Sequence, residues 1–408
     1  MNICNLLFIV IPLLFNINIP VLKTGEKKPM PEVWIDKDTG YKVKRLTKLD
    51  GNYRSFYFHN FPFIIDKNKD TWMVYYGTKE NMTDKQSISS IKQIYAINLN
   101  TGITKVISRS SLYLSGEIVA PKSKKIFYQI KDSIFSTNFE DLKTEFIFKF
   151  PDKIRANVTS INASEEILAG VYSEPLKDTI LKKNPIKSSY FNKIYEAKLP
   201  HYLFIINIKT KKMEIIHTDN AWINHVQFSP IDPELLMFCH EGPWHLVDRI
   251  WTINIKTKKV QLMHKRTIPM EIAGHEFFSR DGKFIWYDLQ IPRGENFYLA
   301  GVNIYSGERK RYRLKRDEWS IHYNISTDGK LFAGDGGDSS QVAKAKNGHF
   351  IYLFYPQGDS LKSEKLVNLK FHDYRLEPNV HFTPDNKLVI FRANFEGKSQ
   401  IYAVEINK

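Results

Sequence analysis

The chain has 408 residues, 42% of them hydrophobic and 13% aromatic, which is enough apolar material for a large folded core. The 59 Lys and Arg residues against 44 Asp and Glu give a net charge of +15, which favours an anionic partner. The lysines are spread over separate turns with no nucleic-acid-binding motif among them, and the two cysteines, Cys4 and Cys239, exclude a disulfide framework. An acidic glycan is therefore favoured over nucleic acid.

Residues 1–24 are expected to be an export segment. An apolar run from Leu6 to Phe15 is too short to cross a bilayer and lies where the hydrophobic region of a signal peptide belongs. Neither Lys nor Arg precedes it and no clear small-residue cleavage site follows, so a buried N-terminal strand is the alternative. We expect an exported protein, periplasmic or secreted, without stable membrane insertion, whose single folded domain covers residues 25–408.

An internal repeat is the most informative feature of the chain. A short turn, often of the type Ser/Thr-x-Asp-Gly-Lys, is followed each time by an apolar strand, in seven copies at 61–76, 117–128, 158–170, 226–238, 276–287, 323–334 and 380–391. Alternating stretches with hairpin turns follow the copies, so each unit contains about four short antiparallel strands. The seventh unit is one strand short, and residues 32–48 can supply it. The sequence predicts an all-β, seven-bladed β-propeller, closed by an N-terminal strand that joins the last blade.

Equivalent positions of the repeat should converge, because the first strand of each propeller blade lines the centre. The residue four positions before the turn is, in chain order, Asn60, Gly116, Val158, His225, His275, His322 and Asn379. These side chains either cap strand entries by bonding loop backbone or form a polar site on one face. Imidazoles with nearby oxygens suit Mn²⁺ or Zn²⁺, whereas Ca²⁺ prefers more oxygen ligands, which Glu377 and Asn379 could supply.

Several segments resemble the oligogalacturonate lyase family, namely 34–47, FYFHNFPF (56–63), FCHEGPWHLVDRIW (238–251), GHEFFSRDGKFIWYD (274–288) and 379–391. The resemblance begins near residue 33 and implies a seven-bladed propeller that cleaves a uronate-containing glycan by β-elimination. It further implies that His240 is the general base and that His275 is a manganese ligand.

The sequence departs from that family near the seventh repeat. Where the family has a Gln and a His-x-His pair in its metal site, this chain has Tyr374, Glu377 and Asn379, and the arginine that assists the family's base has no match at 215–217. The resemblance therefore supports the family's fold for this chain more strongly than it supports the family's pectic substrate. Related propeller lyases act on glucuronate-containing glycans such as ulvan, some with a base from the first blade, which makes His59 a second candidate.

Elimination beside a uronate needs a base, a group that neutralises the carboxylate, and an acid for the leaving oxygen. We expect His240 or His59 as the base and a Mn²⁺ or Ca²⁺ ion at His275, His322, Glu377 and Asn379. Substrate contacts are expected from Arg392, Trp244, Tyr323, Asn60 and His225. The alternatives are a hydrolase that uses Asp288, Asp335 and Asp338, and a non-catalytic propeller that binds glycan or protein. The ring of His and Asn favours catalysis, since a binding module needs no convergent bases.

Overall fold

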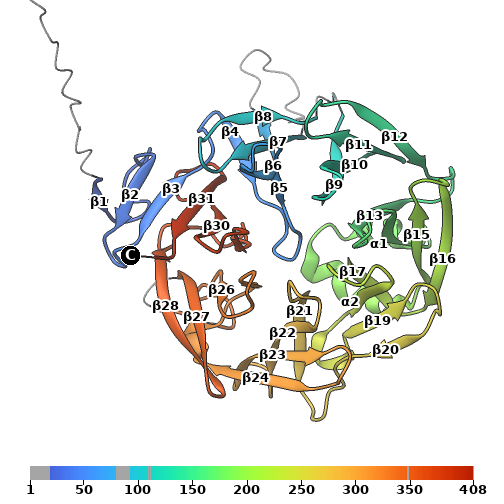
Figure 1. Cartoon of the computed structure of the whole chain (residues 1–408). Coiled ribbons are helices and arrows are strands. Elements are labelled where there is room, and N and C mark those ends of the chain that lie inside the picture. The colour runs from blue at the N-terminus through green and yellow to red at the C-terminus, as the bar shows by residue number, and fades with distance from the viewer. Residues whose placement is uncertain (1–18, 80–91, 109, 111, 347–348, 408) are drawn as a thin grey trace, which may run out of the picture.

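The computed structural model describes residues 19–79, 92–108, 110, 112–346 and 349–407. Residues 1–18 of the predicted export segment, which is residues 1–24, lie outside the described residues. The described chain contains 31 β-strands and two α-helices, which makes the fold all-β. Figure 1 shows the sheets standing side by side in a ring, with β12, β16, β20, β24 and β28 at its rim. No helix in the described ranges is long and apolar enough to cross a membrane.

Four sheets follow one another in chain order from residue 51 to residue 262. Their strands are β4 (Gly51–Arg54), β5 (Phe63–Ile65), β6 (Thr71–Lys79), β7 (Lys92–Asn98) and β8 (Thr104–Val106); β9 (Leu114–Ala120), β10 (Lys125–Ile130), β11 (Ser133–Asn138) and β12 (Thr144–Lys149); β13 (Ala156–Ile161), β14 (Ile167–Ser173), β15 (His201–Asn207) and β16 (Lys212–Asp219); and β17 (Trp222–Phe228), β18 (Leu235–Glu241), β19 (Ile250–Asn254) and β20 (Val260–Leu262). Within each sheet, neighbouring strands pair antiparallel, and in the first sheet both β4 and β5 pair with β6.

Two larger sheets complete the ring. The eight-stranded sheet runs β21 (Ile272–Phe278), β22 (Phe284–Gln290), β23 (Phe297–Asn303), β24 (Arg309–Leu314), β28 (Ser360–Asn368), β27 (Phe350–Gln357), β26 (Phe332–Gly334) and β25 (Tyr323–Ile325). Its two halves are joined by a single pair, Arg313 with Ser360. The six-stranded sheet runs β1 (Val21–Leu22), β2 (Val33–Asp36), β3 (Lys42–Arg45), β31 (Gln400–Glu405), β30 (Leu388–Ala393) and β29 (His381–Phe382).

The six-stranded sheet joins the beginning and the end of the described chain. Strand β3 pairs antiparallel with β31, with Val43 opposite Val404. Trp34 of β2 is fully buried, and its ring packs edge-on against Phe395 and Tyr402 at centroid distances of 6.2 and 6.0 Å. The N-terminal hairpin is thus held by backbone hydrogen bonds and by aromatic packing together.

The hydrophobic core lies between neighbouring sheets. One apolar cluster joins Ile94 of β7 to Ile126 of β10, and another joins Leu203 of β15 to Phe238 of β18. Because both faces of each sheet are covered in this way, the central strands are apolar on both faces, as the sequence FIWYDLQ of β22 illustrates. Their β-branched and aromatic side chains suit such double burial.

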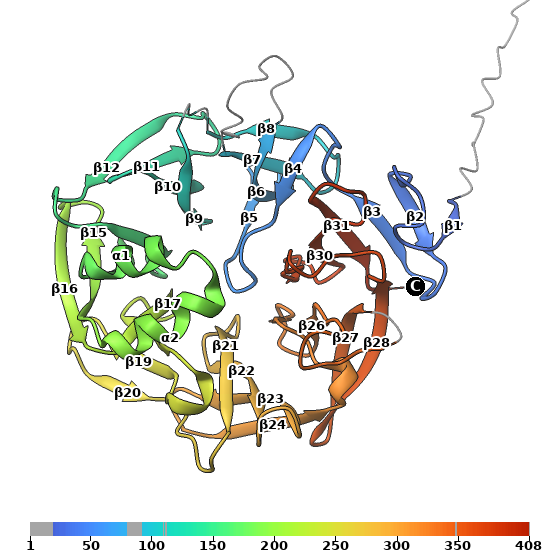
Figure 2. The same cartoon turned by 180° about the vertical axis from the view of Figure 1, so that it is seen from behind.

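Two helices interrupt the third sheet between β14 and β15. They are α1 (Leu176–Lys183) and α2 (Lys187–Ala197), and Figure 2 shows both on the near face of the ring. Only Ile194 of the two helices is buried. The pair therefore covers one face of the ring rather than adding to the core. A cavity lined in part by α2, called the larger cavity below, lies beside it.

Candidate functional site

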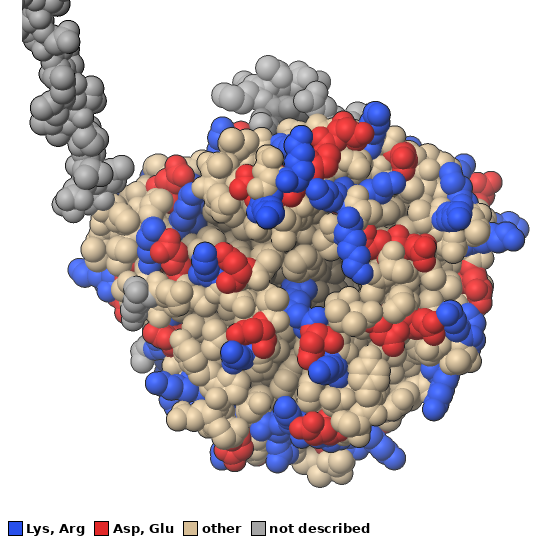
Figure 3. Space-filling view, in the orientation of Figure 1, with Lys and Arg blue, Asp and Glu red and all other residues tan. Residues whose placement is uncertain are grey.

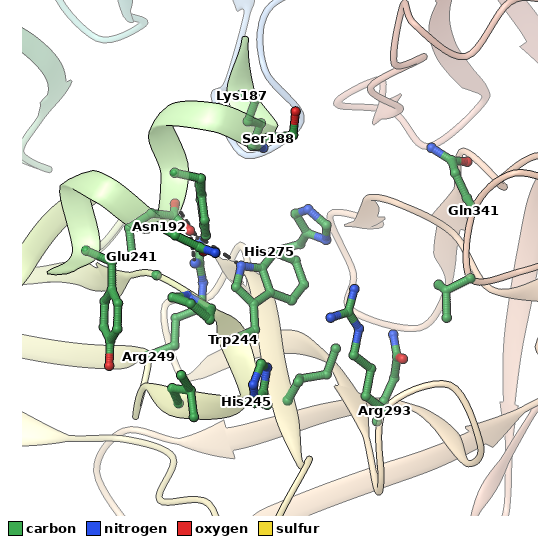
Figure 4. A pocket seen from close by; sticks show the side chains of 18 of the residues that line it. Lys187, Ser188, Asn192, Glu241, Trp244, His245, Arg249, His275, Arg293 and Gln341 are labelled. Atoms are coloured by element: carbon green, nitrogen blue, oxygen red, sulfur yellow. Dashed lines mark hydrogen bonds and ion pairs between the residues drawn. The ribbon is translucent and has the colours of Figure 1, made fainter. Parts of the chain in front are cut away.

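The larger cavity has a volume of about 1120 Å³ and lies on the helix-covered face. Its wall combines Lys187 and Asn192 of α2 with polar and aromatic groups from several sheets (Figure 4). The central wall residues are Tyr57, His225, Glu241, Trp244, His275 and Glu377. A concave site with a few convergent polar groups is where a ligand is expected.

Backbone irregularities bring His225 and His275 into this cavity. Both residues have positive φ, 48° and 52°, where non-glycine residues are uncommon. The pairing of β17 with β18 shifts register between Asn224 and Gln227, and that of β21 with β22 shifts between Gly274 and Phe277. Each histidine therefore lies in a bulge, and bulges commonly re-aim a side chain next to a functional site. Their equivalence in the repeat, predicted from sequence, has this backbone cause.

Tyr57 lies at one end of a buried chain of hydrogen bonds. Its hydroxyl is 3.2 Å from Nε2 of His322, and Nδ1 of His322 is 2.8 Å from Oδ2 of Asp335. The side chains of His322 and Asp335 are fully buried, so the carboxylate fixes the orientation of the imidazole. Burial, together with the nearby Glu377 carboxylate, raises the pKa of the Tyr57 hydroxyl well above its usual value. Tyr57 is therefore a neutral phenol at the cavity wall, and its O–H donates to Nε2 of His322 when Nδ1–H of that ring is donated to Asp335.

His225 belongs to a second buried network. Its Nε2 is 3.3 Å from Oε2 of Glu241, and Nη1 of Arg249 is 2.7 Å from Oε1 of the same carboxylate. Nε of Arg249 donates to Glu276, so one guanidinium joins two buried carboxylates. Burial alone would raise the pKa of Glu241, but Arg249 and His225 hold it well below its usual value. Glu241 therefore stays ionised beside His225.

Tyr57 and His225 face each other across these two networks. Their rings stack with centroids 5.8 Å apart and an interplanar angle of 29°. The cavity thus places a phenol and an imidazole side by side, each held by a buried acidic group. Two adjacent groups of this kind can take up and deliver a proton on one bound molecule.

His275 has an unused donor atom at the same site. Its Nδ1 is buried and has no hydrogen-bond partner among the described residues. Burial lowers the pKa of His275 well below its usual value, so the ring stays neutral and able to bind a metal. The ring centroids of His275 and Trp244 lie 4.9 Å apart. Trp244 packs against β21 at Gly274, where a Cβ would lie 2.5 Å from the indole, so the absence of a side chain there makes room for Trp244.

The predicted metal ligands differ in how free their donor atoms are. Glu377 lines the cavity with its side chain 44% exposed, and His275 offers Nδ1. Nε2 of His322 is engaged by Tyr57. Both amide atoms of Asn379 are used, since Oδ1 accepts from Phe58 N and Nδ2 donates to Glu377 O. The Asn379 side chain therefore bonds loop backbone, which is the role that the capping interpretation of this repeat position predicts. Of the predicted ligands, His275 and Glu377 thus keep donor atoms that could hold a divalent ion.

A second group of possible donors is less suited to manganese. The ligand atoms of His225, Cys239 and Glu241 lie within 4.8 Å of one another. Burial raises the pKa of the Cys239 thiol well above its usual value, and Arg249 already pairs with Glu241. A protonated thiol is a poor ligand, and thiolate would favour zinc over manganese.

His240 and His59 lie outside the wall of the larger cavity. His240 points to the third sheet, with Nε2 3.4 Å from Asp219 and its ring 4.9 Å from that of Trp251. His59 and Asn60 line a second cavity. Burial lowers the pKa of His59 well below its usual value. His240 makes no ring contact with Tyr57 or His225 among the described residues. The ring of His59 lies 5.0 Å from that of Tyr57 and 6.5 Å from that of His225, but His59 lines the second cavity instead of the larger one.

Two other predicted substrate contacts have structural partners instead. Arg392 donates to the carbonyl oxygens of Glu377 and Ser55, and so ties together the segments that carry Glu377 and Tyr57. Tyr323 is fully buried, and its hydroxyl accepts from Ser320 N at 3.0 Å. The structure leaves both side chains off the cavity wall.

Sequence reasoning missed Tyr57. Tyr57 stands two residues before His59 in the segment FYFHN, and the structure aims Tyr57 at the larger cavity and His59 at the second one. A tyrosine three positions before the repeat position Asn60 is the sequence feature that could have indicated Tyr57.

Comparisons with known proteins support the ring of sheets and identify the family. The β-propeller domain of Swd1 from Myceliophteria thermophila superposes with a TM-score of 0.53 over 87% of this chain and 97% of that domain, at 10% identity. The family model for oligogalacturonate lyase matches residues 25–408. The chain belongs to the oligogalacturonate lyase family and is an enzyme of the lyase class.

Individual relatives cover nearly the whole chain. It is 25% identical to an oligogalacturonide lyase of Pectobacterium atrosepticum, over 94% of this chain and 98% of the relative. It is 24% identical to an oligogalacturonate lyase of Dickeya dadantii, over 91% and 95%. The crystal structure of oligogalacturonate lyase from Vibrio parahaemolyticus superposes with a TM-score of 0.78 at 23% identity, over 92% of this chain and 96% of that one. A structure of oligogalacturonate lyase in complex with manganese gives 0.77 at 22%, with the same coverage.

Proposed function

We propose that this protein cleaves a uronate-containing oligosaccharide by β-elimination in the larger cavity. The observation that carries the proposal is the stacked pair of Tyr57 and His225, each held by its own buried acidic network in one cavity. Family membership supports the reaction class. The net charge of +15 favours an acidic substrate.

His225 is the proposed general base. A neutral imidazole can remove the proton next to the uronate carboxylate at neutral pH, and ionised Glu241 at 3.3 Å stabilises the imidazolium that results. The resemblance singles out His240 for this role, and His240 stays the competing candidate. We favour His225 because base, acid and carboxylate-binding group must all reach one sugar ring, and His240 does not line the cavity.

Tyr57 is the proposed acid. Elimination releases the glycosidic oxygen, which needs a proton, and Tyr57 carries one at neutral pH because its pKa is raised by burial. The bond to His322, whose other nitrogen is held by Asp335, orients the phenol, and the proton that His225 takes from the sugar would return to Tyr57 through solvent after each turnover. The acid and the base would thus come from different sheets that meet at the centre of the ring.

The uronate carboxylate requires a positive partner. His275 and Glu377 would hold a divalent ion such as Mn²⁺ or Ca²⁺, whose positive charge would neutralise that carboxylate. Arg293 lines the cavity and offers a further cation (Figure 4). Trp244 presents an aromatic face for the sugar. Oligogalacturonides and glucuronate-containing glycans both satisfy these requirements.

A non-catalytic glycan-binding ring is the alternative, and family membership argues against it. To decide, the purified protein is incubated with oligogalacturonides, ulvan or glucuronate-capped glycans, and the ultraviolet absorbance of the C4–C5 double bond created by elimination is followed. We expect an increase with at least one uronate substrate. Unchanged absorbance with all of them, with Mn²⁺ or Ca²⁺ added, would leave the binding protein as the better proposal.

We also infer that the ring counts seven blades. The single pair of Arg313 with Ser360 is a slight connection, so β21–β24 and β25–β28 are better regarded as two four-stranded blades. Strands β29, β30, β31 and β3 would form the seventh, with the N-terminal strand closing the ring. Export to the periplasm or the medium stays a prediction from the first residues.

A further inference from the structure

A second cavity, of about 370 Å³, lies on the opposite face of the ring from the proposed catalytic site. It is lined by His59, Asn60 and Phe61 and by the turns that join the first and second strands of several sheets, including residues 121–122, 162–165 and 229–230. Strand β17 connects the two sites, since His225 lines the larger cavity and Phe228 the second. In Figure 3 this face is hollowed at the centre of the ring, and Lys or Arg atoms lie in the hollow.

Arg280 is the unpaired cation of this cavity. It lies in the turn between β21 and β22, and its guanidinium carbon is 4.6 Å from the centroid of the Phe61 ring. Among the described residues, no hydrogen bond or ion pair reaches its side chain. Burial lowers the pKa of Arg280 to about 10, which still leaves it charged at neutral pH. A partly desolvated guanidinium without a counter-ion is costly unless something pairs with it.

The other charged groups that line the cavity are already committed. Nζ of Lys122 donates to Ala163 O at 2.6 Å. The two carboxylate oxygens of Glu165 accept from the backbone N–H groups of Lys122 and Ser123 at 2.8 and 2.7 Å. Asp281, next to Arg280 in sequence, is held by Ser279 Oγ and Lys283 N within its own turn. Arg280 is therefore the group that an incoming anion would meet.

The remaining wall determines what kind of anion fits. An apolar part of the wall is formed by Phe61, Ile118, Val119, Phe228 and Phe278, beside polar side chains such as Asn162 and Gln227. Asn162 and Gln227 already donate to the carbonyl oxygens of Pro233 and Glu276. Two of its hydroxyls are used internally, since Thr159 donates to Val226 O and Thr327 to Pro384 O. A sugar would leave many hydroxyls without partners here, whereas an apolar body would not. The planar guanidinium matches the two oxygens of a carboxylate.

We propose that this second cavity binds a small monocarboxylate with an apolar body, its carboxylate paired with Arg280 and its body against Phe61, Phe228 and Phe278. The site is separate from the proposed lyase site and does not depend on the lyase reaction. It gives the face opposite the catalytic cavity a ligand of a different chemical class from the glycan.

Benzoate is the probe that tests this proposal, with benzamide as its uncharged match. Binding to the intact protein is measured by isothermal titration and by saturation-transfer NMR. We expect benzoate to bind and benzamide to bind much more weakly. Arg280→Gln should weaken benzoate binding about tenfold or more, which is the loss expected when a charge-assisted hydrogen-bonded pair is removed.

The matched control is Arg311→Gln, because Arg311 also lies over an aromatic ring, Tyr298 at 4.7 Å, but is exposed at the rim. This control should bind benzoate as the wild type does, and both variants should keep the circular dichroism spectrum and lyase rate of the wild type. Equal benzoate affinity in wild type and Arg280→Gln, or no benzoate binding at millimolar concentration, would overturn the proposal. Arg280-dependent binding of galacturonate in place of benzoate would overturn the assigned ligand class.

Discussion

The hydroxyl of Tyr57 lies 3.2 Å from Nε2 of His322, although the two residues are 265 positions apart in the chain. The contact exists because the segment between β4 and β5 reaches the centre of the ring, where it meets the residues that precede β25. Glu377 Oε2 also lies 3.8 Å from the same nitrogen. The proposed acid therefore depends on three separate parts of the chain.

Removing the Tyr57 hydroxyl should affect turnover and leave the fold intact. Tyr57→Phe keeps the ring that stacks on His225, so the melting temperature should change little, while kcat should fall by about 10²–10⁴-fold, the usual contribution of a general acid. Initial rates of double-bond formation measure the effect. Tyr323→Phe is the matched control, because its hydroxyl only accepts from Ser320 N. It should cost about 1 kcal/mol of stability and leave kcat within a few-fold. The reverse pattern would place the acid at Tyr323.

The two candidate bases can be separated by the same substitution at each. Asn is chosen because it tolerates the positive φ of 48° at His225. His225→Asn should reduce kcat by about 10²–10⁴-fold, and His240→Asn should retain most of the activity, because its imidazole faces Asp219 outside the cavity. Both variants are compared at saturating substrate. An inactive His240→Asn beside an active His225→Asn would return the base to the position that the family resemblance indicates.

Metal binding should depend on His275 and not on Asn379. His275→Ala removes the free Nδ1 and should lower the Mn²⁺ retained after dialysis, as measured by elemental analysis and by the paramagnetic signal of bound Mn²⁺. Asn379→Gly keeps the left-handed backbone at φ 52° but removes two hydrogen bonds. It should retain the metal and lose about 1–3 kcal/mol of stability. Full metal content in His275→Ala would show that the ion, if bound, uses other ligands.

Asp288 predicts a pH dependence of stability. Burial raises the pKa of its carboxyl from 3.8 to about 7, and Gln290 Nε2 bonds only one of its oxygens, at 3.0 Å. Between these two pKa values the folded protein keeps a proton that the unfolded chain has lost, so this group's contribution to stability falls as pH rises and becomes constant above about 7.

Asp288→Asn should abolish this contribution. From pH 5 to pH 8 the wild type should lose about 3 kcal/mol more unfolding free energy than the variant, by urea titration at both values. The same slope in both proteins would mean that Asp288 is ionised in the folded state. None of Asp288, Asp335 and Asp338 is among the described residues that line the larger cavity, which argues against the hydrolase alternative at that site.

The repeat in the sequence allowed the convergence of His225 and His275 to be predicted, because a repeating hairpin pattern places equivalent residues at equivalent depth. It could not give the two bulges that aim them, since a positive φ at a histidine has no signature in one sequence. Nor could it separate His240 from Glu241. A difference of one residue along β18 sends one side chain to the third sheet and the other to the cavity, and that choice depends on strand register.

Asn379 and Arg392 show a different limit of prediction from sequence. Polar residues at a predicted centre suggest a site, so the sequence predicts Asn379 as a metal ligand and Arg392 as a substrate contact. In the folded chain they bond to backbone groups of the segment between β4 and β5, where Asn379 accepts from Phe58 N and Arg392 donates to Ser55 O. Irregular segments at the centre need such partners, because their own N–H and C=O groups are unpaired by any strand. Sequence alone does not reveal which polar residues serve this need.

The pairing of β3 with β31 has a consequence for how the protein is made. The partner of the N-terminal hairpin is β31, and the paired residues Val43 and Val404 are 361 positions apart, so this contact forms only after the ribosome has delivered β31. Until then β3 has an open edge that other chains can pair with. Closing so long a loop is slow, and we expect nascent or truncated chains to need chaperone protection that the finished ring does not.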